Sequence, residues 1–213
     1  MQRTTSMADR AILQFDQMLG TVARRRERPL RPNPASNLPE AELSERERRH
    51  AAGLMRVNHT GEVCAQGLYH GQALTARLGE VRAQMEQAAA EEEDHLAWCD
   101  QRLAELQSRP SLLNPLFYSA SFGLGAAAGL AGDKWSLGFV AATEDQVCRH
   151  LESHLQQLPA HDQRSRAIVE TMLTDEAKHA NQALDAGGKR FPSWLKRLMT
   201  KTSKAMTRTT YRI

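Results

Sequence analysis

Two copies of one short motif constrain this chain more than any other feature of its sequence. They are Glu92-x-x-His95 and Glu176-x-x-His179, and each lies within a long helical pattern. Glu62 precedes Glu92 by 30 residues and Glu144 precedes Glu176 by 32, so each copy follows a lone glutamate at a similar distance. Residues three apart share a face of a helix, and each motif can therefore present a carboxylate and an imidazole to one point. The sequence predicts two half-sites, each built from one helix with Glu and one with Glu-x-x-His.

The candidate ligands lie on the apolar stripes of their helices. Around Glu144, the residues Leu137, Leu151 and Leu158 continue the same line at seven-residue intervals. The other stripes are Met85, Ala88, Glu92, His95, Cys99, Leu103 and Leu106; Ile168, Val169, Met172, Glu176, His179 and Ala183; and, less regularly, Met55, Asn58, Glu62, Ala65 and Tyr69. Four carboxylates are costly to bury unpaired, and two metal cations would neutralise them. This ligand set predicts an all-α, ferritin-like four-helix bundle with two iron or manganese ions.

Proline and glycine divide the chain into three predicted parts. Residues 1–40 should hold an amphipathic helix over 8–27 and a proline-rich linker over 29–40. Residues 41–187 should form the bundle, with helices over about 42–78, 81–107, 136–158 and 162–186 and a stop at Gly187-Gly188. Residues 188–213 should form a basic amphipathic tail, because eight lysines and arginines and no acidic residue follow Asp185.

Composition adds a background to these motifs. A chain of 213 residues suits one domain, and 5% aromatic residues without β-branched runs favour helices over sheets. A net charge of +3 gives no reason to expect a nucleic-acid partner. Cys64, Cys99 and Cys148 are far apart and odd in number, which indicates reduced packing residues of a cytosolic protein. The N-terminus lacks the apolar core of a secretory signal.

The acidic residues beside the motifs offer a simpler alternative. Glu91, Glu93, Asp94, Asp145 and Asp175 flank the candidate ligands, and acidic runs on solvated helix faces produce some Glu-x-x-His matches by chance. Two matches on apolar stripes, each preceded by a stripe glutamate, favour the metal site over chance. The remaining histidines lack this pairing: His50 is expected to be solvated, and the others to be surface or supporting groups, namely His59, His70, His154 and His161.

The residues around the ligands resemble a known family. The stretch Arg56-Val-Asn-His-Thr-Gly-Glu62, followed by Ala65-Gln-Gly-Leu-Tyr69, resembles the first ligand segment of the carboxylate di-iron demethoxyubiquinone hydroxylases. Glu92-Glu-Asp-His95-Leu, Glu144-Asp-Gln-Val-Cys-Arg-His150 and Asp175-Glu-Ala-Lys-His179-Ala resemble its other three ligand segments. The tail from Ala186 to Ile213 is similar to the bacterial members, so the resemblance covers about residues 42–213.

This resemblance implies a monooxygenase of ubiquinone biosynthesis that hydroxylates the ring of a polyprenylated demethoxyubiquinol. Its cofactor would be two iron ions, with O₂ as co-substrate and an external reductant such as NADH. The family places Glu62 and His95 on one iron, Glu144 and His179 on the other, and Glu92 and Glu176 between them. Oxygen-rich coordination with one imidazole per iron suits Fe(II)/Fe(III) cycling. The resemblance also implies a supporting or electron-relay role for His150, whose neighbour here is Leu151 where some relatives carry Tyr.

Two further segments suggest a membrane. Residues 110–132 are 23 uncharged residues, long enough to cross a bilayer, but crossing would separate the two half-sites. We expect an interfacial or re-entrant element that admits the quinol from lipid, with a buried connection between helices as the alternative. In the tail, Trp194, Leu195, Leu198, Met199 and Met206 fall on one side of a helix rich in cations. The tail is expected to hold the protein on the anionic cytoplasmic face of the cell membrane as a peripheral protein, unless it docks onto acidic helices of its own bundle.

Two other classes of protein stay open from the sequence. A ferritin- or rubrerythrin-like protein would use the same ligands for iron storage or peroxide reduction, but it would need neither the apolar segment nor the basic tail. A non-enzymatic membrane adaptor would explain the tail but not four carboxylates on apolar stripes. Association with other enzymes of ubiquinone biosynthesis is a further expectation.

Overall fold

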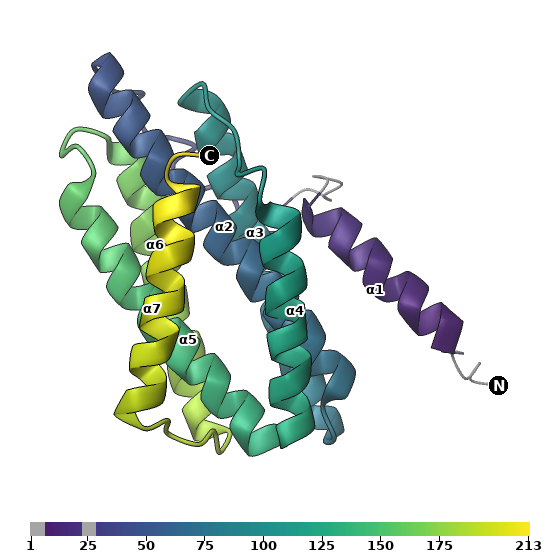
Figure 1. Ribbon diagram of the computed structural model, residues 1–213. Coiled ribbons are helices and arrows are strands. Elements are labelled where there is room, and N and C mark those ends of the chain that lie inside the picture. Colours follow the sequence, from purple (N-terminus) through teal and green to yellow (C-terminus); the bar gives the residue numbers. More distant parts are fainter. Residues whose placement is uncertain (1–6, 23–28) are drawn as a thin grey trace.

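The described part of the chain folds into seven helices (Figure 1). The computed structural model describes residues 7–22 and 29–213, and that part of the chain contains no strand. The all-α fold class predicted from the sequence is confirmed. The helices are α1 (Met7–Val22), α2 (Glu45–Thr75), α3 (Gly79–Glu105), α4 (Asn114–Ala131), α5 (Asp133–Gln157), α6 (Gln163–Asp185) and α7 (Ser193–Thr210).

The bundle consists of α2, α3, α5 and α6, which pack as the pairs α2 with α3 and α5 with α6. Two of its helices begin at clear capping signals. Ser44 and Glu47 form a reciprocal capping box at the start of α2, and Asp162 accepts a hydrogen bond from the Ser165 amide at the start of α6. Gly187, with φ 96°, follows the end of α6 at the position predicted from the sequence.

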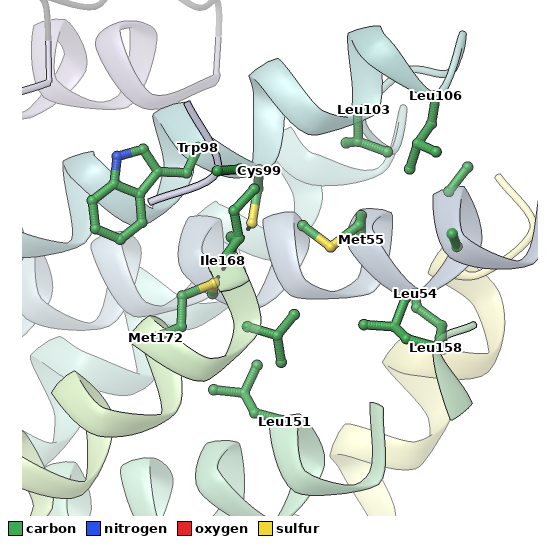
Figure 2. Close-up of a cluster of buried hydrophobic side chains, with 14 residues drawn as sticks. Leu54, Met55, Trp98, Cys99, Leu103, Leu106, Leu151, Leu158, Ile168 and Met172 are labelled. Carbon is green, nitrogen blue, oxygen red and sulfur yellow. Dashed lines mark hydrogen bonds between the residues drawn. The ribbon is translucent and has the colours of Figure 1, made fainter. Parts of the chain in front are cut away.

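Two apolar clusters stack along the bundle, and all four helices contribute to both. The first cluster, shown in Figure 2, contains Leu54, Met55, Trp98, Cys99, Leu103, Leu106, Leu151, Leu158, Ile168 and Met172 among its buried side chains. The second contains Ala65, Tyr69, Ala73, Val81, Met85, Ala89, Leu137, Val140, Ala141 and Ala183. In every helix the candidate metal ligands fall between the residues of the two clusters, so a polar belt crosses the middle of an otherwise apolar core.

The uncharged segment 110–132 forms α4, which lies along α2 (Figure 1). Glycines on both helices permit this close approach. A Cβ atom on Gly125 would clash with the carbonyl of Leu68, and one on Gly67 would lie 2.5 Å from the carbonyl oxygen of Tyr118. The opposite side of α4 exposes Leu116, Leu124 and Leu130, so this segment is not a buried connection. Within the described residues, no helix combines the length and apolar character needed to cross a membrane.

The proline-rich linker packs against the bundle as a strap (residues 29–40). Near its start, Arg31 pairs with Asp94 on α3 and Asp175 on α6. In its middle, Ala35 is fully buried in the first apolar cluster. At its end, Glu40 pairs with Arg102. The predicted N-terminal helix forms as α1, which points away from the bundle in Figure 1. Positions 23–27 of that prediction lie outside the described residues.

The tail forms α7, whose apolar residues divide between two directions. Leu195, Leu198, Met199 and Met206 line a cavity beside the bundle, whereas Trp194 does not line it. Trp194 and part of Leu198 are exposed. The Lys196 ammonium lies 3.3 Å from Asp145 on α5. Beyond α7, the Tyr211 hydroxyl lies 2.6 Å from Nδ1 of His50, so the sequence-based expectation of a solvated His50 is wrong.

Candidate metal centre

The six candidate ligands come from four helices and are all buried. Glu62 lies on α2, Glu92 and His95 on α3, Glu144 on α5, and Glu176 and His179 on α6, and none of the six is more than 6% exposed. Four of them, Glu62, Glu92, His95 and Glu176, offer ligand atoms that all lie within 4.8 Å of one another. The two motifs, 84 positions apart in the sequence, meet at one point of the bundle.

Two glutamates lie between the two imidazoles. Nδ1 of His95 is 2.9 Å from Glu92 Oε2 and 3.1 Å from Glu176 Oε1. Nδ1 of His179 is 3.2 Å from Glu92 Oε1 and 3.3 Å from Glu176 Oε2. We call Glu92 and Glu176 the central glutamates, because each has one oxygen near each histidine. Glu62 lies on the His95 side, 3.8 Å from its Nδ1.

Glu144 is held by a tyrosine. The Tyr69 hydroxyl on α2 donates a hydrogen bond of 2.6 Å to Oε1 of Glu144. Tyr69 is fully buried and belongs to the second apolar cluster, so its ring is fixed by packing. The sequence places Tyr69 on an apolar stripe but does not predict this contact, because a tyrosine in a core stripe does not reveal which carboxylate its hydroxyl reaches.

The outer nitrogen of each histidine is bonded to a carboxylate of the opposite motif. Nε2 of His95 lies 2.9 Å from Asp175 Oδ2, and Nε2 of His179 lies 2.7 Å from Glu91 Oε2. Such partners fix the tautomer and ring orientation of a metal-binding histidine, which here directs both Nδ1 atoms into the cluster. The simpler alternative, in which such acids belong to solvated helix faces, does not describe these two residues, because each contacts a buried histidine. The available signal was their shared position, since each immediately precedes the Glu of a Glu-x-x-His motif.

The charges of the cluster are incompletely balanced by its own groups. Burial, reinforced by the central glutamates, raises the pKa of both Glu62 and Glu144 well above the ordinary value. Burial lowers the pKa of His179, but hydrogen bonds and charge from the central glutamates outweigh it and raise that pKa to about 12. The two imidazoles can therefore stabilise two carboxylates as anions, and the other two need further positive charge to ionise.

The buried oxygens fit a pair of metal ions. Oε1 of Glu92 and Oε1 of Glu176 are buried and receive no hydrogen bond from the described residues, although a histidine nitrogen lies close to each. A buried carboxylate oxygen without a donor is costly unless a cation coordinates it. Carboxylate oxygens with one imidazole per metal suit iron or manganese better than softer metals. The residues present therefore fit a dimetal group.

An apolar cavity of about 340 Å³ reaches this cluster from the side of α4 and α7. Glu62 forms part of its wall, and most of the remaining wall is apolar, including Leu68, Leu124, Phe139, Val147, Leu195, Leu198, Met199 and Met206. His150 on α5 also lines the cavity, and its Nε2 is buried without a partner among the described residues. The structure therefore places His150 beside the cavity and outside the ligand cluster.

Three of the histidines expected to be surface or supporting groups are buried. His154 is 4% exposed, bonds through Nδ1 to Asn58 Oδ1 at 2.7 Å, and lies 4.1 Å from the ring of His150. His59 is buried beside Asp100 and His70 beside Tyr118, whereas His161 is exposed. The apolar periodicity could not indicate these positions, because each imidazole is accommodated by a polar partner on another segment.

Comparison with known proteins agrees with this geometry. Residues 49–210 match the family described as ubiquinone biosynthesis protein COQ7. This chain belongs to that family. A relative from Azotobacter vinelandii is 62% identical over 212 residues, covering 100% of this chain and 99% of its own, and is named 3-demethoxyubiquinol 3-hydroxylase. Relatives of the same name from Pseudomonas fluorescens and Stutzerimonas stutzeri are 61% and 62% identical with the same coverage.

A solved structure supports the predicted fold of this COQ7-family chain. A dodecameric thioferritin from Bacteroides fragilis aligns with a TM-score of 0.55 and 17% sequence identity, covering 67% of this chain and 85% of that one. The ferritin-like bundle predicted from the sequence is therefore confirmed, and at this identity the similarity concerns the fold alone.

Proposed function

We propose that this protein is a 3-demethoxyubiquinol 3-hydroxylase, a monooxygenase that adds a hydroxyl group to the ring of a polyprenylated demethoxyubiquinol. The observation that carries the proposal is the apolar cavity that ends at a buried cluster of four glutamates and two histidines. Full-length relatives above 60% identity bear the name of this activity. A storage protein would have no use for an apolar cavity that leads to its metal site.

The proposed cofactor is a pair of iron ions held by the six ligands. Glu62 and His95 would bind one ion and Glu144 and His179 the other, with the central glutamates bridging them. The bridging role of the central glutamates is supported by their positions, since each lies within 3.3 Å of both histidines. When bound, the iron pair would supply the activation of O₂, with electrons from an external reductant such as NADH.

The protein's own groups would prepare this chemistry. Asp175 and Glu91 hold the Nε2 protons of the two histidines, which leaves both Nδ1 atoms free to bind metal. Tyr69 holds Glu144 in its orientation through a hydrogen bond. The apolar wall of the cavity would take the prenyl tail and exclude water from the ring. We assign His150 the role of orienting the quinol, because its unpartnered Nε2 can bond a ring hydroxyl in the cavity.

The membrane surface is the proposed source of the substrate. The two helices α4 and α7 line the cavity and also carry exposed apolar side chains. These are the exposed leucines of α4 and, on α7, Trp194 and Leu198. Arg197 and Lys201 are exposed on the same α7 helix. Apolar side chains beside cations favour an anionic interface, with about 1 kcal/mol for each cation near the surface. We therefore propose peripheral attachment at the cytoplasmic face of the cell membrane.

Turnover of a defined substrate tests the enzymatic proposal. Protein loaded with Fe(II) and given O₂, NADH and a demethoxyubiquinol with a short prenyl tail should form the hydroxylated quinol, with one oxygen atom from labelled O₂ detected by mass spectrometry. Glu144→Ala and His179→Ala should abolish product, whereas Glu152→Ala, an exposed glutamate of α5, should not. Formation of an iron mineral or rapid peroxide turnover, without quinol hydroxylation, would instead favour the ferritin or rubrerythrin class.

Flotation with liposomes tests the attachment. Binding should require anionic lipid, fall with added salt, and drop when Arg197→Glu and Lys201→Glu are combined with Trp194→Ala. Two charge reversals at Arg46 and Arg49, which are exposed on α2, are the matched control and should leave binding intact. Equal binding by the wild type and the α7 variant would exclude α7 as the anchor.

A further inference from the structure

The strap crosses the outside of the bundle where α3 and α6 carry the metal ligands. Its backbone is fixed there, because the amide of Leu30 donates a 2.7 Å hydrogen bond to Asp94 Oδ1. Asp94 is buried and immediately precedes His95 on α3. The strap thus reaches the cluster from outside, although it lies outside the matched family region of residues 49–210.

The guanidinium of Arg31 joins the two helices at this level. Its Nε donates to Asp94 Oδ2 at 2.9 Å, and its Nη1 donates to Asp175 Oδ2 at 2.8 Å. Its Nη2 lies 3.3 Å from Nε2 of His95, and its central carbon lies 4.9 Å from the centre of the Trp98 ring. A planar fork that is held by two carboxylates and an aromatic face has little freedom to rotate.

One oxygen of Asp175 therefore contacts two partners, Arg31 and His95. This oxygen, Oδ2, accepts from Arg31 and lies 2.9 Å from His95 Nε2. Glu91, the corresponding partner of His179, accepts instead from the neutral amide of Gln87 at 2.9 Å. The two halves of the cluster are alike in their ligands but differ in the outer support of their histidines.

We propose that Arg31 is a positioning residue of the metal centre: it holds Asp175 against His95 and so stabilises metal binding on the His95 side. The proposal rests on the dimetal centre of the proposed function and adds a residue from the N-terminal strap to it. Removal of an outer partner of a metal-binding histidine typically weakens metal affinity by about 10- to 100-fold. The effect should fall on one of the two metal ions.

Titration of the metal-free protein with Co(II) alone, followed by visible absorption, measures this effect without turnover. The wild type should bind two ions, and Arg31→Ala should weaken one of them by about tenfold or more while the other keeps its affinity. Arg31→Lys should restore part of the loss, because its single ammonium can contact Asp175 but cannot form both arms of the fork. The altered ion should also show a changed absorption band, since the geometry at His95 changes.

Two variants separate positioning from simple attachment of the strap. Arg164 also binds the strap, through the carbonyl of Leu38 at 3.2 Å, but lies 12 residues from Glu176 along α6, about 18 Å on a helix. Arg164→Ala should leave both Co(II) affinities unchanged. In an Asp175→Asn background, Arg31→Ala should cause little further loss, because the two residues act in series.

Three results would overturn the inference. They are unchanged Co(II) affinities in Arg31→Ala, equal losses in Arg31→Ala and Arg164→Ala, or full additivity with Asp175→Asn. A wild type that binds no pair of Co(II) ions would overturn the dimetal centre as well, so failure of this inference alone and failure of the proposed function give different results.

Discussion

Acid sensitivity of the bundle should depend measurably on one buried histidine, His154. Burial is the main cause that lowers the pKa of His154, to about 3. Electrostatic repulsion from His150 and His50 lowers this pKa further. Its Nδ1 lies 2.7 Å from Asn58 Oδ1, so the imidazole is accommodated in its neutral form. The ordinary pKa of histidine is 6.5, and the unfolded chain should regain that value.

The direction of the effect follows from the protons bound in each state. Between the two pKa values, the unfolded chain binds a proton at His154 and the folded protein does not, so the free energy of unfolding falls as the pH falls through this window. From about pH 7 to about pH 5, this one group should lower the free energy of unfolding by about 2 kcal/mol. Above about pH 7 the histidine is neutral in both states and contributes no pH dependence.

Urea unfolding of the metal-free protein at these two pH values, followed by circular dichroism, measures the difference. His154→Gln removes the titrating group and keeps a neutral polar side chain, so its loss of stability on acidification should be smaller than that of the wild type by about 2 kcal/mol. His161→Gln, at an exposed histidine, should retain the wild-type loss. The reasoning is refuted if His154→Gln and the wild type lose the same free energy between the two pH values.

Two further substitutions test the packing of α4 and the support of a ligand. Gly125→Leu should lower the free energy of unfolding by about 1–3 kcal/mol, measured by urea titration, because its side chain has no space against α2. Gly123→Ala, on an open face of the same helix, should be neutral or stabilising by up to about 1 kcal/mol, and a similar loss in both variants would contradict the packing argument. Tyr69→Phe removes the hydrogen bond to Glu144 and should weaken Co(II) binding by about tenfold, with unchanged affinity as the contrary result.

The sequence predicted the parts of this molecule that depend on local periodicity. The four bundle helices were expected within a few residues of their observed ends, because an apolar stripe repeats along each of them. For α5 and α6, Pro159 and Gly187 also indicate where the helix ends. The convergence of the ligands was predictable for the same reason. A glutamate within an apolar stripe must face the core, and six such polar positions on four helices have only the middle of the bundle in which to meet.

Contacts between distant segments could not be predicted in this way. Arg31 and Asp175 are 144 residues apart, and nothing in a proline-rich segment indicates which helices it will cross. The glycines of α4 allow this helix to approach α2 closely, and the sequence does not show which helix they face. The spacing of apolar and basic residues identified α7 as amphipathic. Only the folded chain shows that part of its apolar side lines a cavity.

The stacking of two apolar clusters on either side of the ligands affects the order in which this protein matures. Because each cluster draws side chains from all four helices, the bundle can close through apolar packing before any metal arrives. Metal would then enter a preassembled scaffold, in contrast to small zinc domains, whose folding energy is the binding energy itself. Exchange of a bound metal would then be a local event in the middle layer, because the two apolar clusters would hold the helices in register on either side of it.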